Sequence, residues 1–241
     1  MHLARLVATM LIALMALMAL LPLSGARSAP PPAPVTTVYL VPSSDLPTTV
    51  LSDAEIARTA QALTDWANAG LAPAWRLSAV KVVAVPRGAP ALPSTAWYLS
   101  LMPRTDAWGV TGYHFESKTG VPYGEIGVED AINYDFTWTV CVSHELAEML
   151  VNPYTNYFAL NGSGKTAFAR EVGDPVSNSS YKWSENGITY RFTDFVYPSY
   201  FTPGAPYPYD KMHLITRPFG FLQGDYQLVF GAGPLIPLAK G

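Results

Sequence analysis

The chain has 241 residues, of which 49% are hydrophobic and only 14% charged, a composition that predicts a packed globular protein and argues against disorder. The net charge of −3 at pH 7 is mild, and lysines and arginines form no cluster, so nucleic acid is not an expected partner. The one cysteine, Cys141, excludes an intrachain disulfide, and its apolar surroundings indicate a buried hydrophobic role rather than a nucleophile.

Residues 1–29 have the pattern of a secretory signal peptide. A basic residue near the start is followed by an apolar run from Leu6 to Leu23 and then by small residues, so cleavage is expected after Ala26 or Ala29. The apolar run is long for a signal peptide, which keeps an uncleaved membrane anchor as the competing interpretation. With cleavage, we expect a secreted or periplasmic protein without a membrane partner, because no later segment is long and apolar enough to span a bilayer.

The single predicted domain follows a proline-rich spacer at residues 30–35 and covers residues 36–241. Three apolar segments rich in β-branched and aromatic residues predict buried strands: TTVYLVP, SAVKVVAVP and TAWYLSLM. Between the first two, Ser52 and Glu55 form a capping box that opens a helix through about Ala69.

Residues 109–130 contain several glycines and predict a turn-rich segment that ends in a strand near Ile126–Val128. This interpretation places His114 in a loop. A helix is predicted next, from about Phe136 to Val151, and Pro153 ends it because proline disfavours helix at the residue before it.

Beyond this helix, the sequence YKWSENGITYRF predicts a hairpin with Asn186-Gly187 at its tip. The remaining C-terminal segments are rich in tyrosine, phenylalanine and proline, and we expect mostly coil with short strands. The order of elements predicts a single α+β domain. Its mixed sheet would be packed by the N-terminal helix and by the helix of residues 136–151, and its C-terminal half would be irregular.

The helix of residues 136–151 carries the sequence His-Glu-x-x-Glu, from His144 to Glu148. Residues four apart lie on the same helix face, with Cβ atoms roughly 5–6 Å apart, so His144 and Glu148 can bind one metal ion together. In the related pattern His-Glu-x-x-His, the middle glutamate is the general base of a metallopeptidase, and Glu145 is the residue in that position.

A third metal ligand has to come from elsewhere in the chain. The best candidate is Glu171 in the sequence REVGDP, and Asp174 in the same segment could bind the metal or accept a hydrogen bond from His144. The core of the helix, WTVCVSHELAEML, carries no lysine or arginine, so its carboxylates are expected to face a polar pocket or a cation. The alternative is that Glu145 and Glu148 are exposed and that His144 is a structural histidine.

His114 is a further candidate for the site. In a loop before the motif helix, it could stabilise an oxyanion as a catalytic residue or act as an additional metal ligand. An ordinary loop histidine with routine hydrogen bonds is the alternative.

Several segments resemble a group of poorly characterised bacterial and phage proteins. The matching segments are Gly112-Tyr113-His114, Gly120–Tyr123, Ser143–Leu150, Asn152-Pro153, Glu171–Pro175 and Thr193–Phe201. The motif helix and the residues after it are more distantly similar to the plant phosphate-induced, EXORDIUM-like secreted proteins. They also resemble, more loosely, the Glu-zincin peptidases.

The resemblance to the peptidases implies a zinc site on these residues. His144 would be the first ligand, Glu148 would take the second ligand position and Glu171 the third. Glu145 would be the base, and Asp174 would be a carboxylate outside the ligand set. One histidine and two carboxylates make a weaker Lewis acid of the metal, and such a set also suits Mn²⁺ or Ca²⁺.

Two functions follow as hypotheses. The first is a secreted, zinc-dependent hydrolase that acts on peptide or protein substrates through the motif helix and a downstream glutamate. The second is a non-catalytic extracytoplasmic protein, in which a structural metal or polar cluster stabilises the fold and the aromatic C-terminal segments bind a glycan or a surface protein. A third alternative is that no metal binds.

Overall fold

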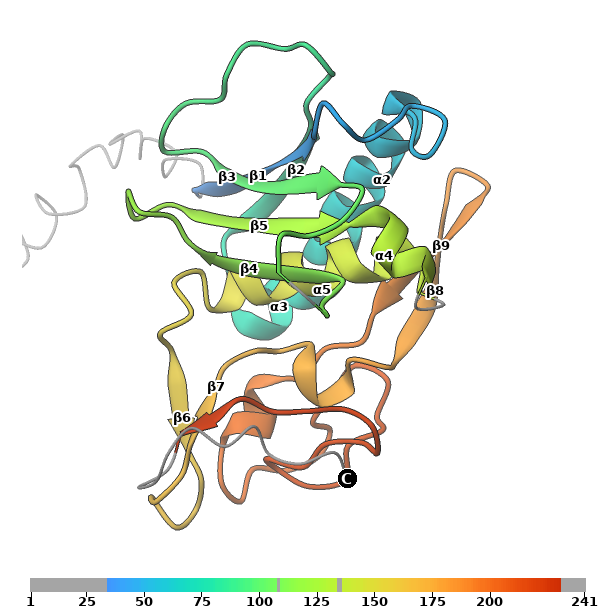
Figure 1. Cartoon of the computed structure of the whole chain (residues 1–241). Coiled ribbons are helices and arrows are strands. Elements are labelled where there is room, and N and C mark those ends of the chain that lie inside the picture. The colour runs from blue at the N-terminus through green and yellow to red at the C-terminus, as the bar shows by residue number, and fades with distance from the viewer. Residues whose placement is uncertain (1–33, 108, 134–135, 231–241) are drawn as a thin grey trace, which may run out of the picture. The chain divides into compact units, whose positions relative to one another are not determined.

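The computed structural model describes residues 34–107, 109–133 and 136–230 (Figure 1). The predicted signal peptide and residues 30–33 of the predicted spacer lie outside the described residues. In the part of the chain that is described, none of the helices combines the length and the apolar character that crossing a membrane requires.

The fold is a single α+β domain whose centre is a mixed five-stranded sheet in the order β2-β1-β3-β5-β4. Neighbouring strands are parallel except β4, which lies at one edge and runs antiparallel to β5. The strands are β1 (Val35–Pro42), β2 (Ala79–Ala84), β3 (Trp97–Met102), β4 (Gly112–Glu116) and β5 (Pro122–Gly127).

The first helix, α2 (Asp53–Trp66), begins where the capping box predicts it. The Ser52 side chain accepts a hydrogen bond from Glu55 N at 3.2 Å, which satisfies one of the free amides at the helix start. The helix then runs on through a π-helical turn at Ala67–Leu71 into α3 (Ala72–Trp75). It is therefore longer than the sequence predicts.

One face of the sheet is buried and the other is partly open to solvent. The buried positions of the central strands carry aliphatic side chains, which pack against the helices: Val38, Leu40, Leu99, Leu101 and Ile126. α2 covers the β2 side of this face, and α5 (Trp138–Val151) covers β4 and β5, with the short helix α4 (Val128–Asn133) leading into it.

The strand predicted near Ile126–Val128 forms as β5, but the residues before it are not mainly turns as predicted, because they contain a second strand, β4, antiparallel to β5. Gly124 shows why. A Cβ atom there would lie 2.5 Å from the carbonyl oxygen of Tyr113 and 2.7 Å from Leu99 Cδ2. Gly124 therefore allows β5 to approach β4 and β3 closely, and it does not lie in a turn. His114 therefore lies on a strand, directly opposite Gly124.

The C-terminal half is irregular, as predicted, with short strands and 3₁₀ turns. The expected hairpin forms, and Asn186 and Gly187 at its tip have φ values of 50° and 77°, the left-handed conformation that such a turn requires. The hairpin strands are β8 (Ser180–Glu185) and β9 (Ile188–Thr193), and a separate small sheet contains β6 (Phe158–Leu160), β7 (Ala167–Ala169) and β10 (Val229–Phe230).

Many aromatic side chains of the C-terminal half belong to the core. Tyr200, Phe201 and Tyr209 are buried, and the Tyr200 and Phe201 rings meet edge to face with centroids 4.8 Å apart. Tyr207 is more than half exposed. Packing thus accounts for most of this aromatic segment.

Candidate metal centre

The motif helix α5 carries its polar residues in the interior of the protein. All 14 residues of the helix are buried, because it lies between the main sheet on one side and β9 on the other. His144, Glu145 and Glu148 are only 9%, 6% and 4% exposed. Glu145 and Glu148 are therefore not exposed, as the alternative interpretation assumed.

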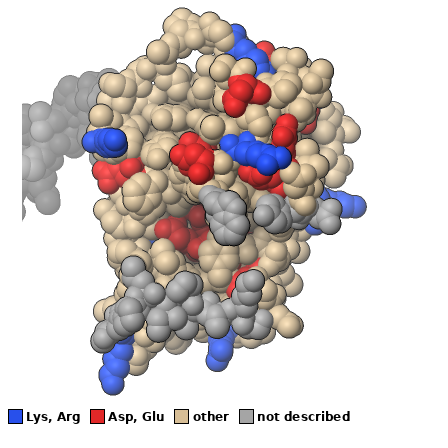
Figure 2. All heavy atoms as spheres, viewed as in Figure 1, with Lys and Arg blue, Asp and Glu red and all other residues tan. Residues whose placement is uncertain are grey.

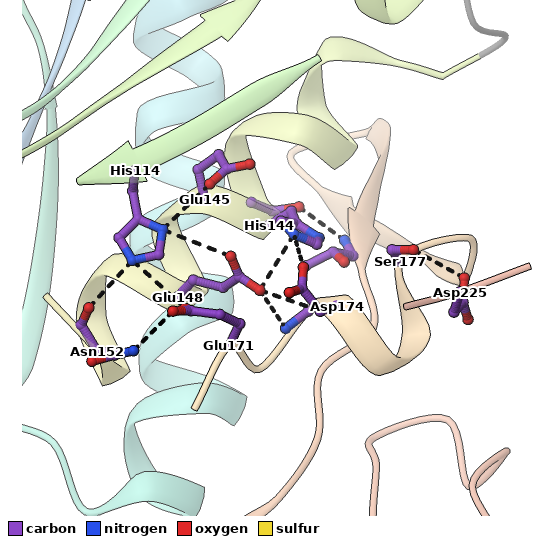
Figure 3. Close-up of polar contacts among 12 residues, drawn as sticks. His114, His144, Glu145, Glu148, Asn152, Glu171, Asp174, Ser177 and Asp225 are labelled. Carbon is purple, nitrogen blue, oxygen red and sulfur yellow. Dashed lines mark hydrogen bonds and ion pairs between the residues drawn. The ribbon is translucent and has the colours of Figure 1, made fainter. Parts of the chain in front are cut away.

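The first cluster, called the His144 cluster, consists of His144, Glu148 and Asp174 (Figure 3). His144 Nε2 lies 3.3 Å from Glu148 Oε1 and 3.5 Å from Asp174 Oδ1. Asp174 begins the 3₁₀ turn Asp174–Val176, and the backbone amides of Gly173 and Asp174 donate to Glu148 Oε1 at 3.0 and 3.2 Å. The turn therefore fixes the orientation of the Glu148 carboxylate.

The second cluster, called the His114 cluster, consists of His114, Glu145 and Glu148. His114 projects from β4 toward α5, and its Nδ1 lies 3.5 Å from Glu145 Oε2 and 3.7 Å from Glu148 Oε2. The other ring nitrogen, Nε2, is hydrogen-bonded to the carbonyl oxygen of Asn152 at 3.2 Å. Since a carbonyl only accepts, Nε2 carries a proton.

Glu171 lies beside His114 rather than in the His144 cluster, where the sequence analysis expected it. Its Oε1 accepts a hydrogen bond from Asn152 Nδ2 at 2.8 Å, and its Oε2 lies 3.7 Å from His114 Nε2. Asp174 was expected to be either a metal ligand or a carboxylate outside the ligand set. In the structure, Asp174 and Glu148 each place a carboxylate oxygen within 3.5 Å of His144 Nε2.

The spacing of these atoms fits a metal ion. Two ligand atoms bound tetrahedrally to zinc at about 2.0–2.2 Å are about 3.4 Å apart. In the His144 cluster the two contacts of His144 Nε2 measure 3.3 and 3.5 Å, longer than most hydrogen bonds. The buried histidine and carboxylate groups of both clusters can therefore hold a metal ion.

Excess negative charge shifts the pKa values of both histidines. Burial lowers the pKa of His114, but Glu145 and Glu171 outweigh burial and raise it above its ordinary value. Burial likewise opposes charge on His144, yet Asp174 and Glu145 raise its pKa overall. Both imidazoles therefore lie where positive charge is favoured.

The carboxylates respond to the same excess charge. Burial raises the pKa of the Glu148 carboxyl well above its usual range, and the carboxylates of Asp174 and Glu171 raise it further. Burial also raises the pKa of Glu171 to about 7, although His114 opposes this shift. A divalent cation bound here would favour the charged form of both carboxylates, because it would offset the cost of burial and the repulsion between them.

A cavity of about 330 Å³ opens beside the centre, and its wall includes His144 and Glu145. Acidic side chains gather in a hollow near the middle of the face shown in Figure 2. Cys141 also lies on the cavity wall, but burial raises the pKa of its thiol to about 11. It therefore stays protonated at neutral pH, in agreement with the predicted hydrophobic role.

The sequence analysis missed three residues that shape the centre. Asn152 follows α5, is fully buried, and contacts both His114 and Glu171. Gly173 and Gly112 have no side chain and so leave room for the side chains of His144 and Glu145. A Cβ atom at Gly173 would lie 2.5 Å from His144 Nδ1, and one at Gly112 would lie 3.0 Å from Glu145 Cγ. All three lie in segments that resemble the bacterial and phage proteins, and Asn152 also stands next to the proline that ends the helix, but none of them was given a role in the site from the sequence.

No protein-family model matches the chain, and neither a curated protein nor a solved structure is significantly similar to it. The resemblances noted in the sequence therefore stay predictions. The functional argument rests on the geometry of the two clusters and of the cavity beside them.

Proposed function

We propose that the protein is a metal-dependent hydrolase that cleaves peptide bonds, with zinc held by His144, Glu148 and Asp174. The observation that carries this proposal is the cavity, because its wall contains both a proposed metal ligand, His144, and the proposed base, Glu145. A metal with a purely structural role is normally enclosed by its ligands, whereas a catalytic metal keeps one position accessible.

Zinc, when bound, would supply a Lewis acid that makes a coordinated water acidic and polarises a carbonyl. The Glu145 carboxylate lies on the cavity wall next to His144 in the sequence, where it can accept a proton from water. His114 Nδ1 lies 3.5 Å from Glu145 Oε2, so the protonated form of His114, which the neighbouring carboxylates favour, would hold this carboxylate in place. Two carboxylate ligands also suit Mn²⁺ or Ca²⁺, so the proposal extends to these ions.

A peptide substrate is favoured by the edge strand β4. Within the described residues, β4 pairs with β5 on one side only, and Gly112 at its start belongs to the cavity wall. Extended peptides bind exposed sheet edges through backbone hydrogen bonds. The edge could therefore hold a peptide across the cavity. The proposed location outside the cytoplasm rests on the sequence of residues 1–29.

The test is the substitution Glu145→Gln, which keeps the shape of the side chain and removes its ability to take a proton. We expect peptide hydrolysis to fall by about 10²–10⁴-fold, while at least one zinc ion per chain stays bound, because Glu145 does not belong to the His144 cluster. Cleavage of a peptide library and elemental analysis measure the two quantities. The control is Asp45→Asn, since Asp45 is exposed, belongs neither to β4 nor to the cavity wall, and should not affect hydrolysis. Wild-type hydrolysis by Glu145→Gln would refute the catalytic role.

A structural metal is the second candidate function. The observation in its favour is that Glu148 Oε1 accepts hydrogen bonds from Gly173 N and Asp174 N, which join α5 to the turn after Glu171. A metal in the same place would strengthen this connection. Loss of thermal stability on chelation, without hydrolysis of any member of a broad peptide library, would favour this function over the first.

A further inference from the structure

The His114 cluster is a second set of ligand atoms that one zinc ion in the His144 cluster does not use. It contains His114 from β4 and Glu145 and Glu148 from α5, with side chains that are more than nine-tenths buried. His114 Nδ1 faces one oxygen from each glutamate, at 3.5 and 3.7 Å. These separations are close to those expected between the ligand atoms of one tetrahedral ion, which are about 3.4 Å.

The hydrogen bond of His114 Nε2 determines which ring nitrogen is available to bind a metal ion. Its Nε2 proton is directed to the carbonyl oxygen of Asn152, so the neutral ring points the Nδ1 lone pair at two carboxylate oxygens. Three electron-rich atoms converge without a donor in that tautomer. A histidine that gives its outer N–H to a backbone carbonyl is the usual arrangement of a metal ligand.

Glu171 is an independent observation on the other side of the ring. It is 7% exposed, and its Oε2 has no hydrogen-bond partner among the described residues, although it lies 3.7 Å from His114 Nε2. A buried carboxylate oxygen left without a partner is costly unless a positive charge lies nearby. A cation on the opposite nitrogen of His114 would polarise the imidazole and strengthen its attraction for Glu171.

Glu148 connects the two clusters. Its Oε1 lies 3.3 Å from His144 Nε2, and its Oε2 lies 3.7 Å from His114 Nδ1, so each oxygen belongs to a different set of ligands (Figure 3). A carboxylate that offers one oxygen to each of two ions is a bridging ligand. Metal ions in two-metal hydrolytic sites lie about 3.5–4 Å apart, which such a bridge allows.

The charges of the centre also match two divalent ions. Four carboxylates are gathered here, and among the described residues their ion-pair partners are the two histidines alone. With all four carboxylates ionised and both histidines neutral, as metal ligands are, one divalent ion would balance half of the negative charge and two would balance all of it. The carboxylates are Glu145, Glu148, Glu171 and Asp174.

We propose that the centre binds two divalent metal ions, one in the His144 cluster and one in the His114 cluster, bridged by the Glu148 carboxylate. This proposal rests on the proposed metal site at His144 and adds a second ion next to it. The second ion would use Glu145 Oε2, while Glu145 Oε1 lies against Gly112, another residue of the cavity wall. Both ions would thus adjoin the space proposed for the substrate.

The test counts metal ions in the purified full chain, first stripped with a chelator and then titrated with Mn²⁺. We expect two ions per chain in the wild type and one each in His114→Gln and His144→Gln. Glutamine at position 114 retains an N–H that can reach the Asn152 carbonyl. The matched control, His213→Gln, should still bind two, because His213 is exposed and belongs to neither cluster.

The outcomes separate this proposal from the proposed function. One Mn²⁺ in the wild type, retained in His114→Gln and lost in His144→Gln, overturns the second site and leaves the first intact. No bound Mn²⁺ in the wild type overturns both.

A measurement on the wild type covers the case in which His114→Gln does not fold. Two Mn²⁺ ions about 4 Å apart interact magnetically, so the electron paramagnetic resonance spectrum at saturation should show spin coupling. A saturated spectrum of isolated, non-interacting Mn²⁺ overturns the proposal.

Discussion

Glu148 is the residue on which both clusters depend. A histidine in its place would offer one ring nitrogen to the interior, whereas a carboxylate offers two oxygens. These reach His144 on one side and His114 on the other. The glutamate at the end of the His-Glu-x-x-Glu motif is therefore explained by its two neighbours in space, and only one of them is close in the sequence.

The contacts of the candidate site differ in whether they could be predicted from the sequence. Helical periodicity alone places His144 and Glu148 together. Asp174 lies as far after His144 in the chain as His114 lies before it, and the segment that contains β6 and β7 brings it back to the helix. His114 could not be placed in this way, because its contact with Glu145 depends on the register of β4 against β5 and on how α5 packs beneath them. Spacing along the chain carries no information about either.

Gly173 gives the sharpest prediction for a single residue. In Gly173→Ala the added methyl group would lie 2.5 Å from His144 Nδ1, so the imidazole has to move away from Glu148 and Asp174. We expect zinc affinity to fall by about 10–100-fold, the usual effect of disturbing a residue that orients a ligand. Competition with a coloured chelator measures the affinity.

The control for this substitution is Gly162→Ala, where the nearest atom to a new Cβ is Pro203 Cβ at 3.6 Å, an ordinary contact. Its zinc affinity should equal that of the wild type. Equal affinity in Gly173→Ala as well would mean that His144 does not bind the metal in the observed orientation.

At the scale of elements, α5 was predicted well because its signals are local. Its apolar sequence and the proline just after its end predict a helix from about Phe136 to Val151, and the observed helix starts two residues later and ends at the same residue. β4 was missed because the glycines in and around it, from Gly109 to Gly124 in the neighbouring strand β5, resemble turn residues. At Gly124 the small side chain instead prevents a clash with Tyr113 and Leu99, which come from two neighbouring strands. Only the assembled sheet reveals that requirement.

The segment after β9 contains a buried carboxylate whose pKa leads to a prediction for pH. Burial, followed by the neighbouring Asp210 carboxylate, raises the pKa of Asp194 to about 8 in the folded protein, against about 3.9 in the unfolded chain. The folded state therefore keeps a proton that the unfolded state loses. The stability that this proton provides is complete below about pH 4 and is lost as the pH rises toward 8.

Asp194→Asn removes this titration while its side-chain oxygen can still accept from Phe195 N and Met212 N. We expect the stability of the variant relative to the wild type to increase steadily between pH 5 and 8, measured by urea unfolding. Asp45→Asn, at an exposed position, should show no such trend. A difference between Asp194→Asn and wild type that stays constant with pH would contradict the raised pKa.

At the scale of the whole domain, α5 joins the two halves of the described chain. It packs on β4 and β5 on one side and on β9 on the other, and the two clusters take ligands from β4, from α5 and from the segment after it. A bound metal would therefore connect elements that are far apart in the sequence. The sequence predicted the α+β class and offered a connection between the helix and the segment of Glu171–Pro175 as one hypothesis, but it could not predict that β4 would also contribute.

Removing the metal should accordingly lower the melting temperature. A ligand present at about 100 times its Kd stabilises the folded state by about 2.7 kcal/mol, and each kcal/mol corresponds to about 2–4 °C for a domain of this size. We expect chelation to lower the melting temperature by about 5–10 °C, measured by scanning calorimetry. His144→Gln should melt lower from the start and respond less to the chelator. An unchanged wild-type melting temperature would count against a metal in the interior.

The central claim is that the buried centre around Glu148 binds metal, and elemental analysis of the purified protein tests it most directly. We predict at least one tightly bound divalent transition metal ion per chain, most of it absent from a variant in which His144 and Glu148 are both replaced by glutamine. The claim is contradicted if the wild type contains no stoichiometric metal and takes up none after incubation with Zn²⁺, Mn²⁺ or Ca²⁺.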